Sequence, residues 1–322
     1  MNQTIDSTAW ERLLETRLLL FRLQQRYGCT VQARERMRSE GMAADLERLE
    51  STEPALARQL AARELVLEAA LQSAPSRARG LVEKALALDP LCPEANLAMA
   101  RLSRTVEESM RYYQRCMDTS LLLLGPERMA RSMEAFRVRP WRDEATLPFL
   151  KAKVGLAELL FRNGFHETAS THFEELLEWN PADDIQLRPY HCISLLCGGR
   201  LAEAARTLRQ AADQLSVPWL YCRAMTAFAA QGDTPESRDA LVVAYRANPW
   251  VPVLLLGMRP MPSTRLLQWR KGRRPLRRGS QLEAADSVRC LGVLLLHNER
   301  LAGWLWQTLQ TYMEAEDQAS FS

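Results

Sequence analysis

Histidine and cysteine are the side chains most often used for nucleophilic and metal chemistry, and here their spacing argues against both roles. His166 and His172 are six residues apart, so on one helix they would point to different faces. His191 and Cys192 are adjacent and cannot face each other. Cys192 and Cys197 have no second pair at the spacing of a zinc site. These residues therefore predict neither a catalytic dyad nor a metal centre.

The adjacent carboxylates of Asp183 and Asp184 are the other candidate for chemistry. They precede a predicted helix, where carboxylates accept hydrogen bonds from free N–H groups and meet the positive end of the helix dipole. We therefore favour helix capping over a catalytic pair. The sequence also has no glycine-rich phosphate loop, no nucleophile elbow and no HExxH motif. It predicts no catalytic residue, no metal and no cofactor, and an enzyme with an unrecognised site is an alternative.

The seven cysteines are odd in number and scattered, and most take the place of a small residue on an apolar helix face. This usage is typical of reduced, buried thiols and not of a disulfide framework. The first residues lack the features of a signal peptide, and no apolar run is long enough to cross a bilayer. We therefore expect a cytoplasmic protein that does not enter a membrane. The cysteines are Cys29, Cys92, Cys116, Cys192, Cys197, Cys222 and Cys290.

Residues 151–181 have the pattern of two short helices joined by a turn. Small and apolar residues recur at intervals of three and four, first as far as Leu160 and then from Ala169. Gly164 permits a tight turn between the two series, and Pro181 ends the second. This spacing is that of a tetratricopeptide repeat, a helical hairpin of about 34 residues.

The hairpin pattern recurs along the chain. Gly164, Gly199 and Gly232 are 35 and 33 residues apart, and the Asn-Pro pairs that begin at 180 and 248 are 68 residues apart, which is twice 34. No strand-like alternation of useful length competes with this period. We therefore predict an all-α fold, a solenoid of tetratricopeptide-type hairpins with capping helices at both ends.

The same pattern is present, less regularly, before residue 125. The interval from Ala78 to Pro90 equals that from Ala169 to Pro181. The predicted organisation is N-terminal capping helices in 1–50, first hairpins in 51–125, a connector in 126–148, regular repeats in 149–250, a basic connector in 251–279 and a C-terminal helical cap in 280–322.

A second group of motifs is spread over residues 80–310. It comprises Leu124-Gly125-Pro126-Glu127, Pro148-Phe149, Lys151-Ala152, Gly155-Leu156-Ala157, Asn180-Pro181 with Asp183 and Arg188, Asn248-Pro249 with Val251-Pro252 and Leu254 to Gly257, and Gly279-Ser280 with Glu283-Ala284. Together these motifs resemble a bacterial family of tetratricopeptide proteins that is similar, in its C-terminal half, to the animal proteins called suppressor of tumorigenicity seven. The resemblance implies an all-helical scaffold.

This chain departs from the family pattern in three ways. Where the resemblance implies Asn-Gln-Gly after Asp183, the chain has Asp184-Ile185-Gln186. The basic insertion before Gly279 looks peculiar to this chain, and the membrane segments of the animal proteins are absent from it. The resemblance therefore supports the fold more than the function.

Stacked hairpins place the first helix of each hairpin on the concave side, so a predicted groove is lined by residues at fixed positions of those helices. Such a groove suits an extended peptide or a helix of a protein partner, and we expect a non-catalytic adaptor or scaffold. The alternative for Tyr190 and Trp219 is packing between repeats. The residues predicted to contact the partner are Lys151, Glu158, Arg162, Gln186, Tyr190, Trp219 and Arg223.

The segment 265–278 is a rival site. It carries seven positive charges and no acidic residue, whereas the whole chain has a net charge of only +3. Arginines around Trp269 suit phosphates and a stacked base, or an acidic protein. A solvated loop is the alternative, and the negative remainder of the chain disfavours nucleic acid. The residues of this possible site are Arg270, Lys271, Arg273, Arg274, Arg277 and Arg278.

Self-association is a further possibility. If Leu301, Trp304 and Trp306 are exposed, they offer an apolar surface to a second copy instead of capping the stack.

Overall fold

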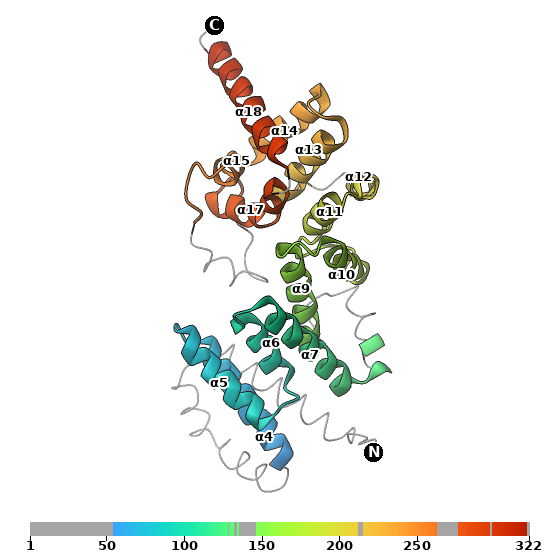
Figure 1. Ribbon diagram of the computed structural model, residues 1–322, viewed down its shortest axis with the longest axis vertical. Coiled ribbons are helices and arrows are strands. Elements are labelled where there is room, and N and C mark those ends of the chain that lie inside the picture. Colours follow the sequence, from blue (N-terminus) through green and yellow to red (C-terminus); the bar gives the residue numbers. More distant parts are fainter. Residues whose placement is uncertain are drawn as a thin grey trace. The chain divides into compact units, whose positions relative to one another are not determined.

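The computed structural model describes residues 54–131 apart from 128, residue 134, and residues 146–211, 215–262, 276–296 and 298–320. All regular structure in these ranges is helical, and they contain no sheet (Figure 1). The helices pack as hairpins in sequence order, which confirms the prediction of an all-α protein built from helical hairpins. The predicted N-terminal caps, most of the connector 126–148 and residues 263–275 lie outside the described residues.

The chain divides into two compact units, Met1–Leu156 and Ala157–Ser322, and the boundary falls within one helix. The helices described in the first unit are α4 (Pro54–Ala70), α5 (Pro75–Leu88), α6 (Pro93–Leu102), α7 (Val106–Leu124) and the start of α9 (Leu147–Arg162). The second unit contains the end of α9, then α10 (His166–Trp179), α11 (Arg188–Cys197), α12 (Leu201–Gln210), α13 (Val217–Gln231), α14 (Pro235–Ala247), α15 (Trp250–Leu255), α17 (Gln281–Leu296) and α18 (Glu299–Ser320).

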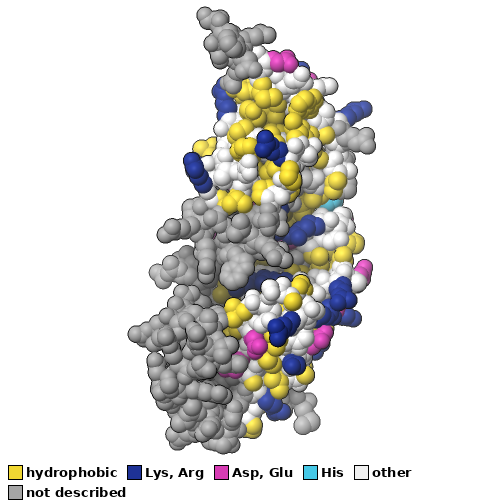
Figure 2. Space-filling model, turned by 90° about the vertical axis from the view of Figure 1, so that its left-hand side faces the viewer, with side chains coloured by type: hydrophobic (Ala, Val, Ile, Leu, Met, Phe, Trp, Pro, Cys, Tyr) yellow, Lys and Arg dark blue, Asp and Glu magenta, His cyan; other side chains and the backbone are white. Residues whose placement is uncertain are grey.

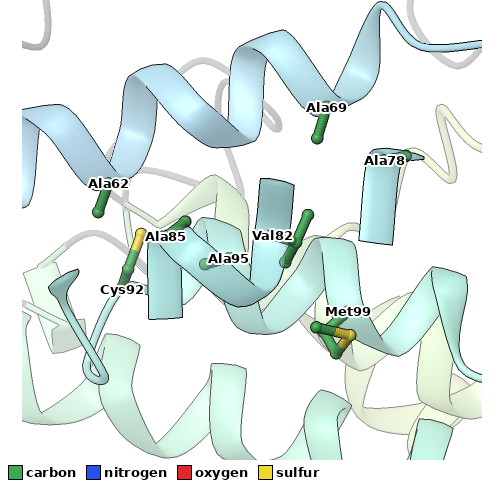
Figure 3. Packing of buried hydrophobic residues seen from close by; sticks show 8 residues of the cluster. All are labelled: Ala62, Ala69, Ala78, Val82, Ala85, Cys92, Ala95 and Met99. Carbon is green, nitrogen blue, oxygen red and sulfur yellow. The ribbon is translucent and has the colours of Figure 1, made fainter. Parts of the chain in front are cut away.

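Small side chains make up most of a buried cluster between α4, α5 and α6 of the first unit. Figure 3 shows Ala62 and Ala69 of α4 directed toward α5 and α6. Small residues at a helix contact allow the axes to approach closely, so the ridges of one helix fit between those of the next. The cluster consists of Ala62, Ala69, Ala78, Val82, Ala85, Cys92, Ala95 and Met99.

Three hairpins of the second unit turn at a glycine. Gly164, Gly199 and Gly232 have φ angles of 84°, 75° and 73°, a region that L side chains rarely adopt. After the first of them, the N–H of Phe165 donates to the carbonyl of Leu160 at 3.0 Å, which satisfies a free carbonyl at the helix end. The predicted turn positions are confirmed.

An Asx-Pro pair ends the second helix of three hairpins. Asp89, Asn180 and Asn248 each precede a proline, and the backbone N–H of each donates to the carbonyl four residues earlier, at 2.9, 3.0 and 3.1 Å. The proline then prevents the helix from continuing. The recurring Asx-Pro pairs therefore mark equivalent positions in the described structure.

Residues 250–255 form α15, where the sequence predicted a connector. Pro249 is the N-cap and Pro252 lies in the first turn, where a missing N–H is tolerated. Val251, Pro252 and Leu254 are buried, so tertiary packing stabilises this helix of six residues. The last helix, α18, continues to Ser320.

The helix α17 lies against three other helices of the second unit. It packs against α11 and α13, the first helices of two hairpins, and against α15, which follows them (Figure 1). The next helix, α18, packs on α14 and α17. We call the surface formed by α11, α13 and α15, together with Glu158 near the end of α9, the A-helix face. Within the described ranges, no helix combines the length and apolar character needed to cross a bilayer.

Candidate functional site

A small network around Asn248 fixes the start of α17. Ser280 Oγ accepts a hydrogen bond from the N–H of Glu283 at 3.2 Å, and the Glu283 carboxylate accepts one from the N–H of Gly279 at 2.7 Å. This exchange resembles a capping box. Asn248 Nδ2 donates to the Ser280 carbonyl at 3.0 Å and to the Glu283 carboxylate at 2.9 Å. The Tyr221 hydroxyl donates to the Asn248 carbonyl at 2.9 Å. Asn248 therefore ties α17 to the end of α14 and to α13.

The buried face of α17 consists mainly of small side chains. Four of its six buried residues are alanine, serine or cysteine, and the other two are leucine. The small residues permit close approach to other helices. The buried residues of α17 are Ala284, Ala285, Ser287, Cys290, Leu291 and Leu294.

A second polar contact to the A-helix face is made by Arg289 of α17. Its guanidinium lies 3.9 Å from the Glu158 carboxylate, and Arg162 donates to the same carboxylate at 2.9 Å. Glu158 is only 9% exposed, so these two guanidinium groups compensate a nearly buried negative charge. Arg289 also lies 3.8 Å from the carboxylate of Asp286, one turn earlier.

Tyr190 lies next to this charged contact. Its ring centroid is 5.4 Å from that of Phe161 and 5.7 Å from that of Phe173. Burial raises the pKa of Tyr190 well above its ordinary value, and the negative charge of Glu158 adds to the rise. The Tyr190 hydroxyl is therefore neutral. The Tyr190 side chain lies between the aromatic rings of α9 and α10 and the edge of the A-helix face.

Three thiols lie where α17 meets α11 and α13. Cys192, Cys222 and Cys290 are each at most 1% exposed. Cys192 Sγ is 3.8 Å from Thr226 Oγ1 of α13, and Cys222 Sγ is 3.8 Å from the Pro189 carbonyl of α11. Burial raises the pKa of Cys222 and of Cys290 well above the ordinary value, so these thiols are not activated nucleophiles.

The structure brings together three of the seven residues predicted to line a groove. Glu158, Arg162 and Tyr190 lie together beside α17. Trp219 is fully buried, and its indole N–H donates to the Ala211 carbonyl at 2.9 Å, so it packs within the unit as the alternative proposed. The other three, Lys151, Gln186 and Arg223, are exposed. A role of these residues in binding a partner stays a prediction.

Sequence reasoning did not identify Asn248, Glu283 and Arg289 as residues that dock α17 on the A-helix face. The Ser-x-x-Glu spacing of Ser280 and Glu283 is a local signal for a helix start that can be read from the sequence. Nothing local indicates which surface the helix covers, because that depends on contacts between distant parts of the chain. Asn248 was recognised only as part of an Asn-Pro helix end.

The rival basic site and the predicted self-association surface are described only in part. Arg277 and Arg278 are exposed, whereas Arg270, Lys271, Arg273 and Arg274 lie outside the described residues. In α18, Leu301 and Trp304 are buried and Trp306 is exposed. The Trp304 indole N–H donates to Asp233 at 3.1 Å, and its ring stacks on Phe228. Leu301 and Trp304 therefore pack inside the unit.

Asp183 caps α11, as the sequence predicted. Its carboxylate oxygens accept hydrogen bonds from the N–H groups of Leu187 at 2.6 Å and Arg188 at 3.1 Å. Burial nevertheless raises the pKa of Asp183 to about 6. Burial also lowers the pKa of His191 to about 4, so this imidazole is neutral near pH 7. In the part of the chain that the structure describes, no three His, Cys, Asp or Glu side chains are placed to hold a metal ion.

Comparison with known proteins adds no family to this description. The sequence matched no family model and no curated protein. The family resemblance drawn from short motifs therefore stays a prediction.

Proposed function

We propose that this protein is a non-catalytic scaffold of tetratricopeptide type that binds a protein partner through the A-helix face. The observation that carries the proposal is that this face already takes a helix, α17, from outside the hairpin series. The face holds that helix by polar contacts at Asn248 and Glu158 and by close apolar packing between them. A surface built in this way suits helical ligands.

The repeat spacing supports the tetratricopeptide assignment. Turn glycines at 33 and 35 residues and Asx-Pro helix ends at 68 residues fit a period of about 34, and the corresponding helices pack as hairpins. The tandem arrangement places first helices in succession, which is what a continuous binding face requires.

The state of the chemical side chains favours binding over catalysis. The thiols of Cys222 and Cys290 are buried with raised pKa values, and the His191 imidazole is enclosed. The Asp183 carboxylate is committed to two backbone N–H groups. None of these groups is both activated and open to a substrate.

Affinity capture from a nuclease-treated lysate of the source cell tests this proposal. The bait proteins are the intact chain, a charge reversal of Arg162 and Arg223 to Glu, and a matched reversal of Arg206 and Arg209 to Glu on α12. All four arginines are exposed. Because Arg162 also donates to the nearly buried Glu158 carboxylate, circular dichroism verifies that each variant keeps the helix content of the intact chain. We expect the intact chain and the α12 variant to retain the same proteins, and the Arg162/Arg223 variant to lose them.

A fourth bait, in which Arg270, Lys271, Arg273, Arg274, Arg277 and Arg278 are neutralised, separates this proposal from its rival. Retention of the same proteins by this variant supports the A-helix face. Recovery of nucleic acid alone from an untreated lysate, with its loss in the neutralised variant, would overturn the proposal in favour of the basic segment.

A further inference from the structure

The A-helix face is occupied by α17, a helix of the same chain. A partner helix can therefore bind at the same place only if α17 leaves it. The 25 residues from Leu256 to Ser280 separate α15 from α17. Among the described residues, α17 is held by its packing on α11, α13 and α15 and by its polar contacts with Asn248 and Glu158.

These contacts are few in kind and define a recognition pattern. A Ser-x-x-Glu start meets the Asn248 amide, small residues pack between α11 and α13, and an arginine six positions after the glutamate meets Glu158. Each contact depends on residue type and spacing within one helix. A helix from another protein with the same pattern would make the same contacts.

The following helix, α18, packs on α17 and also makes contacts of its own with α13 and α14, which can hold it when α17 leaves. In α18, the Trp304 ring stacks on Phe228 of α13 at 4.4 Å and its N–H bonds Asp233. Further along, the Tyr312 hydroxyl accepts a hydrogen bond from Arg246 of α14 at 2.8 Å. None of these contacts involves α17.

We propose that α17 is an internal competitor for the A-helix face, and that the partner is an amphipathic helix of the same pattern that displaces it. This inference rests on the proposed function and names the class of partner. The partner helix begins with a Ser-x-x-Glu cap, carries alanine, serine or cysteine on its docking face, and has an arginine that meets Glu158. The partner then binds the intact chain with lower affinity than it would bind a face without α17, because it must first displace α17.

A labelled synthetic peptide of residues 279–298, with serine in place of Cys290, is the probe for this competition. Its affinity for the full-length chain is measured by fluorescence anisotropy. Glu283→Ala together with Arg289→Ala in the chain weakens the resident helix and leaves the face intact. We expect this double variant to bind the peptide about tenfold more tightly than the intact chain.

Two variants serve as matched controls. Gln281→Ala changes an exposed residue of the same helix and should leave the peptide affinity unchanged. Glu158→Ala changes the face itself, so it weakens resident helix and peptide alike and should give no gain. Circular dichroism verifies that each variant keeps its helix content. Two results would overturn the proposed competition. One is equal peptide affinity of the double variant and the intact chain, and the other is no peptide binding by any form.

The capture experiment distinguishes this outcome from failure of the proposed function. If the intact chain and the double variant retain the same proteins to the same extent, the scaffold function stands and displacement of α17 is wrong. If neither retains a protein, the scaffold function itself fails.

Discussion

Asn180 and Asn248 occupy equivalent positions in two hairpins, but their side chains differ in hydrogen bonding. The Asn248 amide donates to Ser280 and Glu283, and its oxygen accepts a bond from the N–H of Trp250 at 3.0 Å. The Asn180 amide is buried, and among the described residues neither its nitrogen nor its oxygen has a hydrogen-bond partner. Burial of an unbonded polar group opposes folding, whereas a bonded one is neutral or favourable.

Alanine at these two positions should therefore have different effects. We expect Asn248→Ala to lower the free energy of unfolding by about 2–4 kcal/mol, because it leaves the Glu283 carboxylate and the Ser280 carbonyl without this donor. Asn180→Ala should change it by less than about 1 kcal/mol. Urea denaturation of the full chain, followed by tryptophan fluorescence, measures both. Similar losses for the two variants would contradict the assigned hydrogen bonds.

The Asp183 carboxyl gives a prediction about pH. Its pKa is raised in the folded chain to about 6, from an ordinary value of 3.8, because burial outweighs the two N–H bonds. A raised pKa stabilises the fold at low pH, and that contribution is lost as the pH rises through about 6. Asn cannot ionise and keeps an acceptor for the Leu187 N–H.

Asp183→Asn should therefore gain stability relative to the intact chain as the pH rises from 4.5 to 7.5, by about 2 kcal/mol. Urea unfolding of both proteins at these two pH values gives the difference. If the relative stability of the variant falls with rising pH, the N–H bonds dominate and the pKa is lowered instead.

At the scale of the helix, two glycines in the first unit have opposite surroundings. A Cβ at Gly155 in α9 would lie 2.5–2.7 Å from the ring of Tyr113, which is buried in α7. A Cβ at Gly80 in α5 would meet nothing within 4 Å. Glycine at position 155 is therefore required by the close approach of α7 and α9, whereas glycine at position 80 only lowers helix propensity.

Alanine substitution tests this difference with the second site as control. Gly155→Ala should destabilise the chain by about 1–3 kcal/mol, because the buried tyrosine must shift. Gly80→Ala should stabilise it by about 0.5–1 kcal/mol through helix propensity. Thermal unfolding followed by circular dichroism reports both. A neutral Gly155→Ala would mean that Tyr113 adapts freely.

Helix positions were the part of the structure that local sequence predicts best. Gly164, Gly199 and Gly232 are required where the chain must take a positive φ angle, so their spacing identifies the turns. Residue 186, where the family resemblance implies glycine, has a φ angle of 58° although it is glutamine. The short helix α15 was missed, because its stability comes from burial of Val251 and Leu254 and not from helix length.

The candidate site was only partly predictable for a physical reason. Periodicity predicts that Glu158 and Tyr190 belong to the first helices of their hairpins, and both lie at the A-helix face. It also placed Trp219 on such a helix, but could not show that its side chain is fully buried. Docking of α17 depends on the contact of Asn248 with Glu283, 35 residues away, and on that of Arg289 with Glu158, 131 residues away, and no local pattern records such contacts.

At the scale of the whole molecule, the second unit contains both the proposed binding face and the helix that occupies it. On the side of this unit seen in Figure 2, hydrophobic side chains gather at the surface with a few basic ones among them. The exposed large hydrophobic residues of the unit include Val243, Met258, Leu296 and Trp306. They offer apolar surface outside the A-helix face, so a partner helix need not be the whole interface.

The cysteines provide a measurement of α17 displacement in the unmodified chain. Cys290 of α17 and Cys192 and Cys222 beneath it are buried while α17 is docked. Cys92 and Cys116 belong to the first unit and are equally buried, so they serve as internal controls. A thiol reacts with an alkylating reagent only when it becomes accessible.

The most direct test of the account is the rate of iodoacetamide alkylation at each cysteine of the full chain, measured by mass spectrometry with and without a saturating amount of the 279–298 peptide that lacks Cys290. We predict that the peptide accelerates alkylation of Cys290 at least severalfold and leaves Cys92 and Cys116 unchanged. An unchanged rate at Cys290 under saturating peptide would contradict the claim that a partner helix takes the place of α17 on the A-helix face.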